Sequence, residues 1–165
     1  MPDGSTFNSP KPVTTDEVRE AFATVGRLIG TDDNVVTTVA GWLSTWSLDA
    51  AITAASAQGE FTDAGYLMAY RSALAEAADP ELVLRRGETN AAEREGWAEK
   101  ADREAVQWQE TAEKIDAAQR PQCRADYEAR AERARNFAAH CRTEAERFRR
   151  GAAEVYERLT AKEAA

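Results

Sequence analysis

Three side chains of this 165-residue sequence are of types suited to nucleophilic or metal chemistry: Cys123, His140 and Cys141. We expect all three on one helix, where seventeen positions place His140 about 25 Å from Cys123, too far to activate a nucleophile. The same geometry prevents a disulfide between the two cysteines of one chain. Neighbours on a helix point about 100° apart, so His140 and Cys141 need further ligands to hold a metal. We therefore interpret Cys141 as a small core residue and His140 as a solvent-facing residue.

Other patterns typical of enzymes are missing from the sequence. A carboxylate-bridged di-iron bundle needs paired Glu-x-x-His motifs, but the residue three positions before His140 is Phe137. The glycines Gly26, Gly30 and Gly41 are isolated, so they form no phosphate-binding loop. We predict no catalytic, cofactor-binding or metal site and expect that the protein is not an enzyme. The sequence leaves open whether Cys123 is a reactive thiol.

The strongest pattern in the chain is a pair of alanine series that mirror each other about Pro121. Alanine recurs at every seventh position, at Ala91, Ala98, Ala105 and Ala112 and then at Ala131, Ala138, Ala145 and Ala152. Both stretches follow the alternating three- and four-residue spacing of coiled coils, and a proline would break one continuous helix. The pattern predicts an antiparallel Ala-rich helical hairpin over residues 89–165, with its turn near residues 119–123.

Charged residues beside the alanines agree with this register. Folding the chain at the proline brings Asp102 level with Arg142, and Glu95 level with Arg149. Exposed pairs of this kind contribute only about 0.2–1 kcal/mol each, but they help to fix the orientation of the two helices.

An alanine seam buries little apolar area, so the hairpin needs further contacts. Trp97 and Phe137 fall on the same edge of the predicted hairpin, and Val155, Tyr156 and Leu159 extend beyond the last alanine partner. We predict that these five residues form an interaction surface. It would dock on the N-terminal helices, on another subunit, or on both.

The residues before the hairpin predict a helical head of four to five short helices over residues 14–88. A capping box at residues 14–17 begins a helix that we expect to end at Gly30. An apolar line that includes Trp42 and Trp46 predicts a buried central helix. The Asp79-Pro80 pair begins a short helix that we expect to end at Gly87. Residues 1–13 contain three prolines and predict a flexible N-terminal tail.

The charge and hydropathy of the chain limit which classes of partner we expect. The net charge is −8, and residues 1–88 carry six basic against thirteen acidic residues. Nucleic-acid binding needs clustered Lys and Arg, so that partner is disfavoured. Threonines and serines dilute the most apolar stretch and no basic residues flank it, so we expect no membrane partner. The start of the chain does not resemble a signal peptide, which favours the cytoplasm or a particle assembled there.

These observations favour a non-enzymatic structural or interaction protein that acts through helical packing. It would bind a protein partner, form a homo-oligomer, or do both. The size, acidity and helical character of the chain fit a phage or mobile-element assembly component, such as an adaptor, a scaffold or a chaperone-like factor. The alternative is a small acidic helical regulator or inhibitor that binds another protein. A helix-turn-helix DNA binder over residues 34–78 is least favoured, because Arg71 is its only basic residue.

Overall fold

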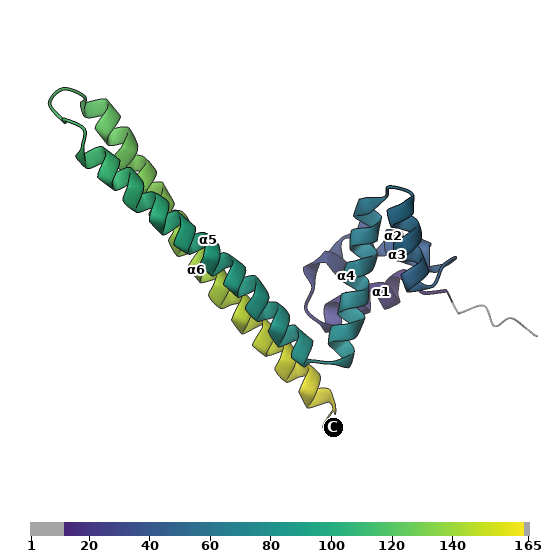
Figure 1. The fold of residues 1–165 in the computed structure, drawn as a ribbon. Helices are drawn as coiled ribbons and strands as arrows, with labels where there is room; N and C mark the ends of the chain where they lie inside the picture. The colour runs from purple at the N-terminus through teal and green to yellow at the C-terminus, as the bar shows by residue number, and fades with distance from the viewer. Residues whose placement is uncertain (1–11, 164–165) are drawn as a thin grey trace, which may run out of the picture. The chain divides into compact units, whose positions relative to one another are not determined.

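A computed structural model of the chain describes residues 12–163. The described residues form helices and no strands: α1 (Thr15–Thr24), η1 (Leu28–Thr31), α2 (Asp33–Leu43), α3 (Leu48–Ala57), α4 (Phe61–Ala78), α5 (Glu81–Glu113) and α6 (Pro121–Glu163) (Figure 1). The predicted all-α fold, with short N-terminal helices followed by a long antiparallel hairpin, is confirmed. The chain divides into two compact units between Pro80 and Glu81. Most of the predicted flexible tail, residues 1–11, lies outside the described residues.

Helix α1 begins at the predicted capping box but ends earlier than expected. The backbone N–H of Glu17 donates to Thr14 Oγ1 at 3.2 Å, and that of Thr14 donates to Glu17 Oε2 at 2.8 Å. The predicted end at Gly30 is wrong, because Gly26 adopts a positive φ of 67° that stops the helix after Thr24. Residues 28–31 then form the separate 3₁₀ turn η1.

The core of the head unit is formed by apolar faces of α1, α2 and α4 and by two buried alanines of α3. Phe22 is fully buried, and its ring meets the edge of Tyr70 with centroids 5.9 Å apart. The burial of α2 is confirmed for its valines, which include Val35 and Val39. The prediction that this buried face continues to Trp46 is wrong, because α2 ends at Leu43 and Trp46 is 46% exposed.

A buried ion pair joins the segment after α1 to α4. Arg27 Nη2 lies 2.6 Å from Glu76 Oε1, and the side chains of these residues are 17% and 4% exposed. The guanidinium also donates to Ser72 Oγ at 2.6 Å and to the carbonyl oxygen of Ala69 at 3.1 Å. These bonds satisfy most of the buried polar groups, which would otherwise be costly.

The boundary between head and hairpin lies earlier in the chain than predicted, at the start of α5. The expected helix end at Gly87 is wrong, because α5 runs from Glu81 to Glu113 without interruption. A Cβ atom on Gly87 would lie 2.4 Å from the Cβ atom of Ala152. The glycine therefore lets α6 approach closely, and the hairpin begins at residue 81 instead of residue 89.

The hairpin consists of α5 and α6, which lie side by side (Figure 1). The eight alanines that predicted it are all buried, with exposures of 0–6%. Residues 114–120 connect the helices, and Pro121 occupies the first position of α6, where its missing N–H has no cost. The turn therefore begins earlier than the predicted residues 119–123.

Candidate functional site

One edge of the hairpin is closed by ion pairs, and we call Glu88, Glu95, Asp102, Arg142 and Arg149 the ionic edge. Arg149 donates from Nη1 to Glu95 Oε1 at 2.7 Å and from Nε to Glu88 Oε2 at 3.1 Å. Arg142 and Asp102 form a second pair. The two predicted pairs are confirmed, and the contact with Glu88 is additional.

Arg149 changes the acid–base properties of the carboxylate beside it. Its hydrogen bond to Glu95 lowers the pKa of that carboxyl, and the contacts with Glu95 and Glu88 raise the pKa of the Arg149 guanidinium. Because the pKa of Glu95 is lowered and that of Arg149 is raised, this pair remains charged over the whole neutral range.

The other edge of the hairpin carries large aromatic side chains that remain exposed. Trp97 is 42% exposed and Phe137 is 49% exposed. Together with Lys100, Ala101 and Glu104 they line a hollow of about 280 Å³. The structure therefore brings Trp97 and Phe137 together as the sequence predicts. We call Trp97, Phe137 and the adjoining Arg94 the aromatic edge.

Arg94 fixes part of the aromatic edge. Its guanidinium carbon lies 4.4 Å from the centroid of the Trp97 ring and 5.9 Å from that of Phe148. Its Nε atom is 3.4 Å from Glu144 Oε2. A cation held over the indole by a carboxylate limits the freedom of the Trp97 side chain, so this edge is preorganised.

The remaining predicted interaction residues lie at the end of α6 and are less accessible. Leu159 is buried, at 7% exposure, and Val155 and Tyr156 are half-buried. Tyr156 Oη donates to Glu81 Oε1 at 3.2 Å. The expectation that this end has no partner within the hairpin is wrong, because α5 extends back to Glu81.

The cysteines and the histidine lie where the sequence predicts. Cys141 is buried and Cys123 is exposed. The His140 side chain is 62% exposed, with Nε2 3.7 Å from Glu144 Oε2. Within residues 12–163, no three His, Cys, Asp or Glu side chains are grouped so that they could hold a metal ion. None of the helices in that range combines the length and apolar character needed to cross a bilayer.

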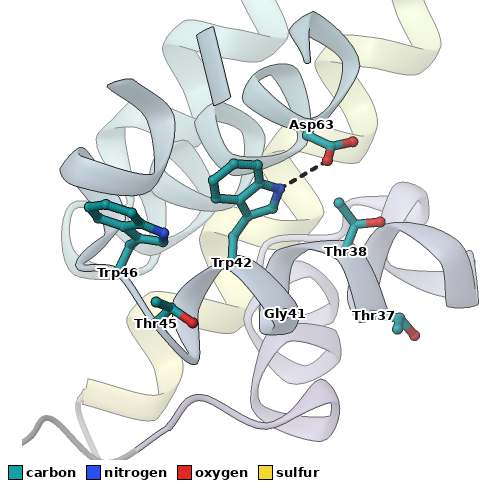
Figure 2. A pocket seen from close by; sticks show the side chains of 7 residues that line it. All are labelled: Thr37, Thr38, Gly41, Trp42, Thr45, Trp46 and Asp63. Carbon is teal, nitrogen blue, oxygen red and sulfur yellow. Dashed lines mark hydrogen bonds between the residues drawn. The ribbon is translucent and has the colours of Figure 1, made fainter. Parts of the chain in front are cut away.

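A second hollow, of about 380 Å³, lies on the head unit and was not predicted (Figure 2). It is lined by residues of α2, of the segment that follows α2, and of α4: Thr37, Thr38, Gly41, Trp42, Thr45, Trp46 and Asp63. Trp42 Nε1 donates to Asp63 Oδ2 at 2.9 Å. The spacing of the two tryptophans in the sequence fits a buried helix face, so the sequence alone does not indicate the hollow.

No protein-family model matches this chain, and no curated protein or solved structure is significantly similar to it.

Proposed function

We propose that this protein is a non-enzymatic interaction protein that self-associates through the aromatic edge of its hairpin. Two copies would form a dimer, which suits an adaptor or scaffold component of a larger assembly in the cytoplasm. The observation that carries the proposal is the pair Trp97 and Phe137, which remain 42% and 49% exposed around one hollow.

The composition of the aromatic edge supports this role. Tryptophan, other aromatic residues and arginine are enriched among the residues that dominate binding energy at protein interfaces. Arg94 already holds Trp97 in place, so little side-chain entropy is lost when the surface is covered. The ionic edge contains no aromatic residue, and its two arginines are already paired with carboxylates of the same hairpin.

The shape of the hairpin supports a two-fold arrangement. A hollow flanked by protruding rings is self-complementary when two copies meet about a two-fold axis, since the rings of each copy can enter the hollow of the other. Helix α5 has 33 residues and is about 50 Å long. Two such hairpins can bury the roughly 800 Å² per partner typical of a stable interface.

The DNA-binding alternative receives no support from the head. Arg71, the basic residue of α4, has Nη1 3.3 Å from Asp49 Oδ1. A recognition helix needs basic or polar side chains that are available to bases and phosphates.

Light scattering coupled to gel filtration tests the proposal. We expect the full chain to run as a dimer, and the double variant Trp97→Ala/Phe137→Ala to weaken the dimer about 30-fold or more, which corresponds to the 2 kcal/mol of a hot spot. Val106→Ala is the matched control, because Val106 is 57% exposed on the same helix but does not line the hollow. A chain that stays monomeric at high concentration, or a dimer that the double variant leaves intact, would refute the proposal.

A further inference from the structure

The geometry points to a second binding site, independent of the hairpin: the hollow beside Trp42, Trp46 and Asp63 binds an arginine side chain of a basic partner protein. Figure 2 shows the indole of Trp42 directed at Asp63, with Trp46 on the other side of Trp42. Thr37 and Thr38 lie on α2, and Thr45 lies in the segment that follows it. The hollow thus combines two aromatic rings, one carboxylate and several hydroxyl groups.

The carboxylate of Asp63 supplies the anionic contact. One oxygen, Oδ2, accepts the hydrogen bond from Trp42 Nε1 at 2.9 Å, which fixes the side chain. No described residue donates to the other oxygen, Oδ1, so it retains its capacity to accept a charged N–H donor. A guanidinium hydrogen-bonded to a carboxylate makes a contact about twice as strong as one between neutral groups.

The indole rings of the head lack the cation that the hairpin tryptophans have. Arg94 lies 4.4 Å from the centroid of Trp97, and Arg130 lies 5.3 Å from that of Trp108. Among the described residues, no arginine or lysine lies over Trp42 or Trp46. A planar guanidinium can stack on an indole and donate from its rim at the same time, which an ammonium or a neutral group cannot do as well.

The charge of the head unit favours a basic partner. Residues 12–80 contain ten acidic residues and three arginines. All three arginines are engaged within the head, in the pairs Arg19–Asp33, Arg27–Glu76 and Arg71–Asp49. No basic side chain of the described head therefore competes for Asp63, and the excess negative charge attracts a cationic segment.

Gly41 keeps the hollow open. It lies within α2, where glycine costs roughly 0.5–1 kcal/mol relative to alanine. Apart from its chain neighbours and the backbone of its own helix, no described atom lies within 4 Å of the position of a Cβ atom on Gly41, so packing against the rest of the fold does not require glycine there. Because Gly41 lines the hollow between Thr37 and Thr45, a side chain at this position would occupy the space of the ligand.

Nuclear magnetic resonance of the full chain, with a capped Gly-Arg-Gly-Arg-Gly peptide as the probe, tests this site. We expect the indole N–H signals of Trp42 and Trp46, assigned with Trp42→Phe and Trp46→Phe, to shift in a saturable way. The signals of Trp97 and Trp108 serve as the internal reference. The same peptide with citrulline, a neutral isostere, should bind at least tenfold more weakly.

Variants of the hollow separate a specific site from general attraction. Asp63→Asn keeps an acceptor for Trp42 but removes the charge, and we expect it to weaken binding about tenfold. Gly41→Leu fills the space, and Trp46→Ala removes a ring that is 46% exposed, so both should weaken binding while the circular dichroism spectrum is retained. The control Glu20→Gln removes one exposed acidic residue of α1 and should leave the affinity unchanged.

Three outcomes would overturn the inference. The arginine and citrulline peptides could bind equally well, Asp63→Asn and Glu20→Gln could have equal effects, or a neutral disaccharide could shift the two indole signals when the arginine peptide does not. None of these measurements depends on dimerisation, because Trp97→Ala/Phe137→Ala should bind the arginine peptide as the unsubstituted chain does.

Discussion

Among single residues, Arg27 makes the most concentrated set of polar contacts in the head. Its guanidinium meets a carboxylate, a hydroxyl and a carbonyl oxygen, all on α4. The Nε atom is buried and has no hydrogen-bond partner among the described residues. A buried charge is stable only while its partners are in place, so this side chain links the segment after α1 tightly to α4.

Substitution of Arg27 should be strongly destabilising. We expect Arg27→Met to lower the free energy of unfolding by about 3 kcal/mol or more, because Glu76 loses its guanidinium partner in a site where it is 4% exposed. Urea unfolding followed by circular dichroism measures the change. Arg19→Met should cost less than about 1 kcal/mol, since Asp33 is 89% exposed. Equal losses in the two variants would show that burial does not set the strength of the pair.

The hollow beside Trp42 and Trp46 could not be predicted from these residues in the sequence. The spacing of Trp42 and Trp46 fits an apolar helix face, and the valines before them are indeed buried. The hollow arises because α2 ends at Leu43 and Asp63 arrives from α4. That contact joins residues 21 positions apart, so no local periodicity could indicate it.

At the scale of whole helices, the alanine spacing predicted the helix pairing correctly, whereas the glycines gave wrong helix ends. The alanine spacing predicted the pairing of α5 and α6, because repeated small side chains on both helices have few other interpretations. The sequence predicted helix ends at Gly30 and Gly87, and both predictions are wrong. Gly26 has a positive φ and ends α1, whereas Gly87 is helical and faces Ala152. The difference depends on a tertiary contact, so it could not be predicted locally.

Two glycines of α5 should respond in opposite ways to alanine. We expect Gly87→Ala to destabilise the hairpin by about 1–3 kcal/mol, because the new methyl group would overlap Ala152. Gly96→Ala should stabilise it by about 0.5–1 kcal/mol, because alanine favours the helix and, apart from the chain neighbours and the backbone of α5, no described atom lies within 4 Å of the added methyl group. Thermal unfolding of both variants provides the comparison. A more stable Gly87→Ala protein would mean that α5 and α6 are not in close contact there.

At the scale of the whole molecule, the chain consists of two compact units that meet in sequence at Pro80 and Glu81. Each unit has its own buried residues: large apolar side chains such as Phe22 and Leu67 in the head, and mainly alanines in the hairpin. Most of the net negative charge lies in the head, because residues 81–165 contain 17 basic and 18 acidic residues and are nearly neutral. The two proposed binding surfaces therefore belong to units of different chemical character.

The two units should fold independently. We expect residues 12–80 and residues 81–165, produced separately, each to be helical and to unfold cooperatively. Their circular dichroism spectra, weighted by length, should add up to the spectrum of the full chain. A fragment that is unfolded alone but becomes helical when mixed with the other would contradict this expectation.

The two cysteines differ in exposure, and this difference allows a spin label to report how two copies are oriented in the proposed dimer. Cys123 lies exposed in the first turn of α6, while Cys141 is buried in the seam. A maleimide spin label should therefore react at the tip of the hairpin alone, without mutagenesis. Because α6 is 43 residues long, labels on two copies would be close together if the hairpins run parallel, and about 50 Å or more apart if they run antiparallel. One distance between the two spin labels would thus determine whether the hairpins of the dimer run parallel or antiparallel.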